Sequence, residues 1–392
     1  MSRLEYLLAG GLLRIARLLF LRLPARPDRV VLATARVTKL DGNLLFLYRA
    51  MRERHPELDY VLLLEPYSYG WMGKLVYLAR LVRGMYHLQT ARLFVVDNAY
   101  LPIHVAPHRS TTTVIQVWHS AGALKRFGLD TRTPLAEPER TFLHRYYDVV
   151  VVGGERMRAT FAAALRTPLE RVLALGSPRT DYFFDEAAMA AARGRVLEAH
   201  PALAGRRVIL YAPTFRGRGK GKRAAPGFDA IRLRANLPAS HALVLKTHPN
   251  LDPAATPTAG FDVVADPAEE INDLLALTDI LITDYSSSVV EFALLHRPII
   301  LLVGDLADYE LDPGLCVDYR TEMIGTQVTD TDEVIEAITT GRFDLSGYDA
   351  FIERQLGAAR GGASDRVVTH FLGDRTVSRG GGDTLPPDVR HV

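Results

Sequence analysis

The feature that most constrains the fold is a repeated alternation of short apolar, β-branched runs with helical segments. The alternation begins at RVVLAT (29–34) and begins again at RVILYAP (207–213). Buried strands that alternate with helices are typical of parallel sheets covered by helices on both faces. At 392 residues the chain is long enough for two such units. We therefore expect an α/β protein with two doubly wound, Rossmann-like domains that face a cleft, connected somewhere in 178–206. The other strand-like runs of the first half are 60–64, 92–97, 112–118, 147–155 and 171–176.

Four apolar runs in the second half each end in polar residues that could hold phosphate. Because parallel strands open their carboxyl ends on one side of a sheet, these residues should meet at one crevice. Four such groups predict a site for a phosphorylated ligand. The polar residues are Thr214 and Arg216 after the first run, Lys246 and His248 after the second, Thr283, Asp284, Ser286, Ser287 and Ser288 after the third, and Asp305 after the fourth.

The third group, TDYSSSVVEF (283–292), allows two interpretations. Three serines at a helix start offer hydroxyl donors beside unsatisfied backbone N–H groups, at the positive end of the helix dipole. Alternatively, Ser288 and Glu291 have the spacing of a capping box, which needs no ligand. The capping box leaves Ser286 and Ser287 without a role, so we favour phosphate binding.

A histidine follows an apolar run at two places. His119, in VIQVWHSAGALKRFG (114–128), could remove a proton from an incoming hydroxyl, with Lys125 close behind to hold an anion. The alternative is a structural histidine buried under Trp118. His248 follows Lys246 by two residues, a pair that suits a leaving phosphate.

The segment GSPRTDYFF (176–184) places Arg179 and Asp181 just after a strand of the first domain, close to the expected cleft. We take both as substrate-binding candidates. The alternative is a structural ion pair between Arg179 and Asp181 within a turn.

The amino-terminal segment 1–30 is basic and apolar at helical spacing. It holds six arginines against Glu5 and Asp28, which is 6 − 2 = +4, whereas the whole chain carries only +2. Its arginines interrupt any stretch long enough to cross a bilayer. We expect an amphipathic helix over 1–27 that lies on an anionic membrane; the alternative is a leading helix packed on the first domain.

The motifs together resemble the CDP-glycerol glycerophosphotransferases of teichoic-acid synthesis. They are WHSAGALK-x-FG, GSPRTD, YAPTFR, K-x-HP and LITDYSSS-x-x-E-F followed by RPII, over residues 114–314. The HSAGALKRFG motif and short length are more similar to the priming enzymes than to the long polymerases. The resemblance implies a GT-B fold, a donor nucleotide bound by the carboxyl-terminal domain, peripheral attachment to the cytoplasmic face of the membrane, and a histidine at position 119 as base.

The resemblance implies transfer of a polyol phosphate from CDP-glycerol or CDP-ribitol to a lipid-linked saccharide or polyol-phosphate acceptor, with release of CMP. We expect no cofactor, metal or nucleic acid; the single Cys316 fits a reducing cytosol. The alternatives are a GT-B nucleotide-sugar glycosyltransferase and a non-catalytic nucleotide-binding protein. The basic loop RGRGKGKR (216–223) is either a polyanion-binding loop or a solvated insert. The expected parts are a helix over 1–27, an acceptor domain over 28–185, a donor domain with a bracing helix over 186–372 and a disordered tail over 373–392.

Overall fold

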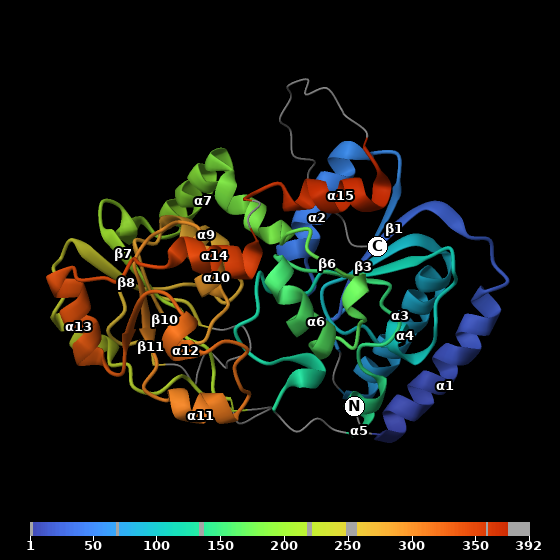
Figure 1. Ribbon diagram of the computed structural model, residues 1–392, viewed down its shortest axis with the longest axis horizontal. Coiled ribbons are helices and arrows are strands. Elements are labelled where there is room, and N and C mark those ends of the chain that lie inside the picture. The colour runs from blue at the N-terminus through green and yellow to red at the C-terminus, as the bar shows by residue number, and fades with distance from the viewer. Residues whose placement is uncertain are drawn as a thin grey trace.

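The computed structural model describes residues 3–67, 70–132, 137–217, 222–247, 257–357 and 360–374, and these form two six-stranded sheets (Figure 1). Every strand pair is parallel. The first sheet has the order β2-β1-β3-β4-β5-β6 and the second β12-β11-β10-β7-β8-β9. The expected α/β fold with two doubly wound domains is therefore confirmed. The strands are β1 (Arg26–Thr34), β2 (Asp59–Leu64), β3 (Ala91–Val96), β4 (Thr113–Gln116), β5 (Val149–Val151), β6 (Val172–Leu173), β7 (Arg207–Tyr211), β8 (His241–Leu245), β9 (Val263–Val264), β10 (Ile280–Thr283), β11 (Ile299–Leu302) and β12 (Thr326–Val328).

Alternate residues of a strand point to opposite faces of the sheet. Helices cover both faces of each sheet. In β1, Val31 and Ala33 belong to one core cluster and Val30 and Leu32 to another. The helices are α1 (Arg3–Phe20), α2 (Gly42–Arg54), α3 (Gly70–Thr90), α4 (Leu101–Val105), α5 (Glu137–Phe142), α6 (Arg158–Ala164), α7 (Glu186–Ala199), α8 (Ala230–Ala235), α9 (Ile271–Leu277), α10 (Ser288–Ala293), α11 (Leu306–Leu311), α12 (Tyr319–Glu322), α13 (Thr331–Thr340), α14 (Tyr348–Leu356) and α15 (Ala363–Leu372).

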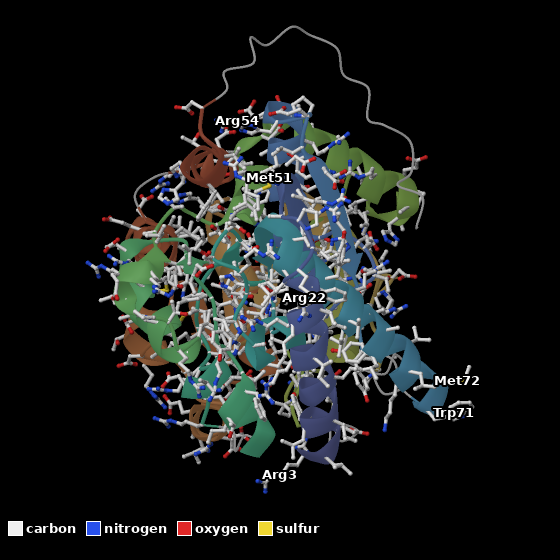
Figure 2. All side chains as sticks on the ribbon, turned by 90° about the vertical axis from the view of Figure 1, so that its right-hand side faces the viewer. Arg3, Arg22, Met51, Arg54, Trp71 and Met72 are labelled. Atoms are coloured by element: carbon white, nitrogen blue, oxygen red, sulfur yellow. The ribbon has the colours of Figure 1, made fainter. Side chains whose placement is uncertain are left out.

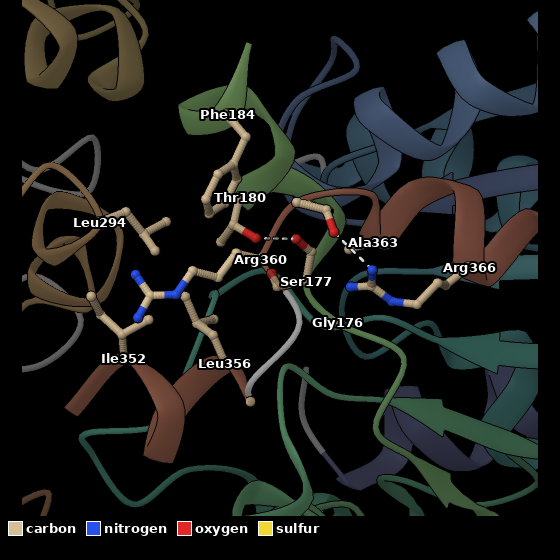
Figure 3. A pocket seen from close by; sticks show the side chains of 12 residues that line it. Gly176, Ser177, Thr180, Phe184, Leu294, Ile352, Leu356, Arg360, Ala363 and Arg366 are labelled. Atoms are coloured by element: carbon tan, nitrogen blue, oxygen red, sulfur yellow. Dashed lines mark hydrogen bonds between the residues drawn. The ribbon is translucent and has the colours of Figure 1, made fainter. Parts of the chain in front are cut away.

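The chain crosses between the domains twice. The first crossing lies between the 3₁₀ helix η4 (Pro178–Phe184) and α7. The second lies between α14 and α15, so the bracing helix expected at the end of the second domain is in fact two helices. Helix α14 packs near α10 of the second domain, whereas α15 contributes Val367 and Val368 to a core cluster of the first domain. Figure 3 shows Phe184, Leu294, Ile352 and Leu356 gathered around a small pocket at these crossings.

Two adjacent glycines allow the domains to approach closely near the second crossing. A Cβ atom on Gly153 would lie 2.6 Å from the carbonyl oxygen of Gln355, and one on Gly154 would lie 2.5 Å from the nitrogen of Gly357. These distances are far shorter than side chains tolerate. The two glycines that end the predicted strand over 147–155 therefore admit the end of α14.

Candidate active site

A cleft of ≈ 380 Å³ lies between the two domains, beside strand carboxyl ends of both sheets. It brings together several of the residues that the sequence singled out. The wall from the first domain contains Arg36, Lys39, Asp41, His119 and Arg179, and the facing wall contains Lys246, Thr247, Ser286, Ser287, Ser288 and Glu291.

His119 lies three residues beyond the end of β4, in the wall formed by the first domain. Its Nδ1 is 3.3 Å from the backbone carbonyl oxygen of Asp97, at the end of β3. A carbonyl oxygen can only accept a hydrogen bond, so Nδ1 carries the proton in this contact. The acceptor nitrogen of the neutral ring is then Nε2, which is the arrangement that a general base requires. The ring also packs on Trp118, with centroids 4.5 Å apart, as the structural interpretation of His119 expects.

The serine segment precedes α10 and lines the opposite wall. The alternative of a capping box is wrong: α10 begins at Ser288, the cap position is Ser287, and no side chain caps it. The Ser286 hydroxyl instead accepts the Ser288 N–H at 3.3 Å and the Ser288 hydroxyl at 2.9 Å. Glu291 cannot complete the box because its carboxylate pairs with Arg179 of the other domain. Ser286 and Ser287 remain half-buried at the cleft.

Lys246 lines the cleft, but its ammonium group is occupied by protein. It donates to the backbone carbonyl oxygens of Asp266 at 2.7 Å, Pro267 at 3.0 Å and Glu269 at 2.6 Å. An ammonium group has three donors, so all are used. Burial lowers the pKa of Lys246. In this conformation Lys246 holds the loop before α9 in place and does not present a proton donor to a ligand.

Arg216 is absent from the residues that line the described part of the cleft and belongs to a network of strand-end residues. Its guanidinium pairs with Asp305 at 2.6 Å and with Asp284 at 2.9 Å. Asp284 also accepts the backbone N–H of Thr214 at 2.9 Å and its hydroxyl at 3.0 Å. The Thr283 hydroxyl donates to Ala212 at 2.6 Å, which joins β10 to the end of β7. The structure thus brings these predicted residues together, but it neutralises the arginine with two carboxylates.

Lys125 belongs to the loop that follows His119 and reaches the second domain. The loop is held there by hydrogen bonds from Arg126 N to Gly314 O at 2.9 Å and from Cys316 N to Leu124 O at 2.8 Å. The Lys125 ammonium lies 5.3 Å from the centre of the Tyr309 ring. Burial lowers its pKa to about 8, and the positive charge of Arg216 acts in the same direction.

Arg179 and Asp181 do not pair with each other. Arg179 contacts Glu291 across the cleft, with 2.5 Å between Nε and Oε1. The Asp181 carboxylate accepts the backbone N–H groups of Ala363 and Ser364, both at 2.7 Å. Asp181 therefore anchors the start of α15 and is absent from the residues that line the described part of the cleft.

Two buried amides at the site were not singled out from the sequence. Asn43 donates to the carbonyl oxygens of Val117 at 3.0 Å and Trp118 at 2.9 Å, and accepts the Arg179 N–H at 2.9 Å. Gln355, on α14, accepts the Ala123 N–H at 3.1 Å. The only local signal for Asn43 was its place at the start of a predicted helix, and its partners lie 74 or more residues away.

Some predictions fall on residues that the structure does not describe. His248 lies outside the described residues, as do the middle of the basic loop at 218–221 and the tail from residue 375. The ends of the basic loop do pair: Arg216 and Arg223 exchange two backbone hydrogen bonds of 2.9 Å. Within the described ranges, no group of three or more His, Cys, Asp or Glu side chains could hold a metal ion.

Known proteins match most of the chain. A family model described as CDP-Glycerol:Poly(glycerophosphate) glycerophosphotransferase matches residues 15–372. The chain is 32% identical to a teichoic acid ribitol-phosphate primase of Bacillus spizizenii, over 91% of this chain and 94% of the primase. It is also 32% identical to a teichoic acid poly(ribitol-phosphate) polymerase of the same organism, of which it spans only 57%.

The chain is 29% identical to a teichoic acid glycerol-phosphate primase of Bacillus subtilis, over 83% of each protein. Among solved structures, the wall teichoic acid polymerase TagF superposes with a TM-score of 0.73 at 19% identity, over 95% of this chain and 98% of that chain. This likeness agrees with the GT-B fold.

Proposed function

The chain belongs to the CDP-glycerol:poly(glycerophosphate) glycerophosphotransferase family, and from this premise we propose that it transfers a polyol phosphate from a CDP-polyol to an acceptor hydroxyl. The product would be a teichoic acid or a related cell-surface polymer. The observation that carries the proposal is the cleft, in which His119 lies on one wall and the serine segment on the other. The imidazole of His119 can take a proton, and the hydroxyls of the serine segment can bind a diphosphate.

The chemistry follows from this arrangement. The acceptor oxygen attacks the phosphorus that bears the polyol, and a new P–O bond forms. The bond from that phosphorus to the bridging oxygen breaks, and CMP leaves with the bridging oxygen. His119 Nε2 takes the acceptor proton, and the hydroxyls of Ser286 and Ser287 stabilise the charge on the phosphate oxygens.

The donor is proposed as CDP-glycerol or CDP-ribitol. The relatives include both a glycerol-phosphate primase and a ribitol-phosphate primase, at 29% and 32% identity. The deciding experiment incubates the protein with each donor and a lipid-linked acceptor and measures CMP. CMP release that requires both acceptor and His119 supports the proposal. A protein that binds CDP but releases no CMP with either donor would be a binding protein, and release of UDP from a UDP-sugar would indicate a glycosyltransferase.

We also propose that the protein works on a membrane surface, to which its α1 helix binds. The packed face of α1 is built from Ala9, Gly10, Leu13 and Ala16. Its other face is apolar and exposed, with Leu4, Leu7, Leu8, Leu12, Ile15, Leu18 and Leu19. The helix lies on the side of the first domain away from the second sheet (Figure 1). Among the described residues, no helix is both long and apolar enough to cross a bilayer.

A second element extends this apolar surface. The first turns of α3 expose Trp71, Met72, Leu75 and Val76, and Trp71 is 74% exposed. Figure 2 shows Trp71 and Met72 projecting from the body, at the end of the molecule where Arg3 of α1 also lies. Exposed apolar side chains on two helices that contact each other suit the interfacial region of a bilayer.

The arginines of α1 contribute less to membrane binding than their number suggests. Arg14 Nε donates to Val105 O at 3.1 Å and Arg17 Nε donates to Pro107 O at 2.6 Å, so both are tied to the first domain. The packed face agrees with the alternative of a leading helix packed on the first domain, and the exposed apolar face supports the proposed contact with lipid. Its leucines, more than its charges, would hold it to lipid.

A further inference from the structure

The Arg179 side chain connects the two walls of the cleft. Its Nη1 donates to the backbone carbonyl oxygen of His119 at 2.7 Å. Its Nε lies 2.5 Å from Oε1 of Glu291, which belongs to the other domain. Both side chains are almost entirely buried, with 12% and 3% exposed. One guanidinium therefore contacts both the backbone of the proposed base and a carboxylate of the opposite wall.

The backbone at His119 needs such support. The preceding residue, Trp118, has a φ of 53°, which bulky residues adopt only where the surroundings enforce it. Its N–H donates to the Gln116 side chain at 2.8 Å, and its carbonyl oxygen accepts from Asn43 at 2.9 Å. Arg179 fixes the next carbonyl oxygen along the chain. These three contacts hold the backbone at His119, whose ring also contacts Asp97 and Trp118, and only Arg179 among the three reaches the second domain.

Glu291 lies in the first turn of α10, three residues after Ser288. Residues three apart on a helix are neighbours on its surface and move with it. A shift of the start of α10 on donor binding would therefore move Glu291 as well. Burial raises the pKa of Glu291, and the charge of Arg179 opposes that rise, so the carboxylate needs its arginine to stay ionised.

We propose that Arg179 is a positioning residue that couples donor binding at the serine segment to the placement of His119. It would act through the ion pair with Glu291 on one side and the His119 carbonyl oxygen on the other. The proposal rests on the proposed function, because it takes the serine segment as the donor site and His119 as the base.

The direct test follows the His119 ring by NMR while CDP is added. The Cε1–H signal of His119 is assigned by its loss in His119→Gln. We expect CDP to shift this signal in the wild-type protein, and the shift to fall at least threefold in Arg179→Gln and in Glu291→Gln. The CDP affinity, measured by calorimetry, should change by less than about threefold. An equal shift in the wild type and Arg179→Gln, or no shift in the wild type, overturns the coupling. Failure of CDP to bind the wild type would overturn the proposed function itself.

Kinetic measurements distinguish a positioning role of Arg179 from a purely stabilising one. Arg179→Lys keeps the charge but loses the planar fork, so kcat should fall by about 10- to 100-fold with little change in donor KM. The exchange Arg179→Glu with Glu291→Arg restores an ion pair but leaves no donor for the His119 carbonyl oxygen. It should recover the melting temperature without recovering kcat. Full recovery of kcat would show that the ion pair alone matters.

A matched control breaks another contact between the domains. Arg132 Nη1 donates to Glu310 O at 2.8 Å, far from Arg179 in the sequence. Arg132→Gln should leave kcat within about twofold of the wild type. A fall as large as that of Arg179→Lys would mean that any weakened domain contact slows the reaction, which contradicts a specific role for Arg179.

Discussion

The guanidinium of Arg216 binds the carboxylate of Asp305 with two hydrogen bonds, of 2.6 Å from Nε and 3.1 Å from Nη2. Such a bidentate pair is strong and directional. Its position beside Asp284 adds a second carboxylate at 2.9 Å. The most obvious cation at the predicted phosphate site is therefore already neutralised, and its first role is to hold three strand ends together.

We predict that Arg216→Gln destabilises the protein by about 3–5 kcal/mol, because it leaves two buried or half-buried carboxylates without their cation. Urea unfolding measures the loss. The control is Arg320→Gln, which removes an ion pair with Glu310 whose arginine side chain is 57% exposed, so unfolding should shift far less than in Arg216→Gln. A variant of normal stability that binds CDP poorly would instead make Arg216 a donor ligand, as the sequence suggested.

The serine segment yields a second prediction. Ser287→Ala should weaken CDP binding by about 1–3 kcal/mol at unchanged stability, because its hydroxyl lines the cleft and no cap bond depends on it. Ser288→Ala loses one hydroxyl bond to Ser286 and should cost only about 0.5–1.5 kcal/mol of stability. Calorimetry with CDP and thermal unfolding measure the two effects. The assignment is wrong if Ser288→Ala loses CDP affinity and Ser287→Ala does not.

The buried Asp97 predicts a pH dependence of stability. Burial raises the pKa of its carboxyl to about 6, although Arg36 at 3.7 Å opposes the shift. Between about pH 4 and pH 6 the folded protein then holds more protons at this site than the unfolded chain does. Stability contributed by this group therefore falls as pH rises through that window and is constant above it.

Asp97→Asn removes this effect while keeping the shape and the backbone carbonyl that His119 contacts. We expect it to stabilise the protein by about 2–3 kcal/mol at pH 7 and hardly at all at pH 4. Urea unfolding of both proteins at pH 4, 5, 6 and 7 checks this. A constant difference between the two proteins across the series would rule out titration of Asp97 in this range.

Local sequence patterns were enough to predict the sheets but not the partners that the polar residues bind. The strands follow from β-branched runs such as 207–213, and of the strand-end groups predicted to meet at one crevice, Lys246 and the serine segment line the same cleft. The capping box failed because Ser288 and Glu291 have the right local spacing, whereas a buried arginine 112 residues earlier is the stronger partner. Lys246 donates hydrogen bonds to three backbone carbonyl oxygens. These bonds depend on the path of a loop, which no local pattern specifies.

The packing of the amino-terminal helix also could not be predicted from its local pattern. Its apolar periodicity suggested one exposed face, but the smaller residues Ala9, Gly10 and Ala16 form the packed face together with Leu13. Leu13 is fully buried in the core of the first domain. Deletion of residues 1–25 would therefore expose that core, and we expect the truncated protein to lose stability. Substitutions on the exposed face are the better test of membrane binding.

The last prediction concerns this face. Leu8→Glu with Ile15→Glu changes two side chains that are 66% and 60% exposed. Burying one such side chain in lipid contributes about 1.5–3 kcal/mol to the free energy of membrane binding. The double variant should therefore lose binding to vesicles of phosphatidylcholine and phosphatidylglycerol by about tenfold or more, with an unchanged melting temperature. The loss should persist at high salt, because Arg14 and Arg17 are engaged within the protein.

The matched control is Ile231→Glu, an equally apolar side chain that is 62% exposed on α8 of the second domain. It should bind vesicles as the wild type does, since α8 lies far from α1. Co-sedimentation with vesicles at low and high salt measures all three proteins. Equal binding by the double variant and the wild type would remove α1 from the membrane contact, and the next variant to test would be Trp71→Glu on α3. Equal losses in the double variant and Ile231→Glu would show that any added negative charge repels the anionic vesicle, and that the apolar face has no particular affinity for lipid.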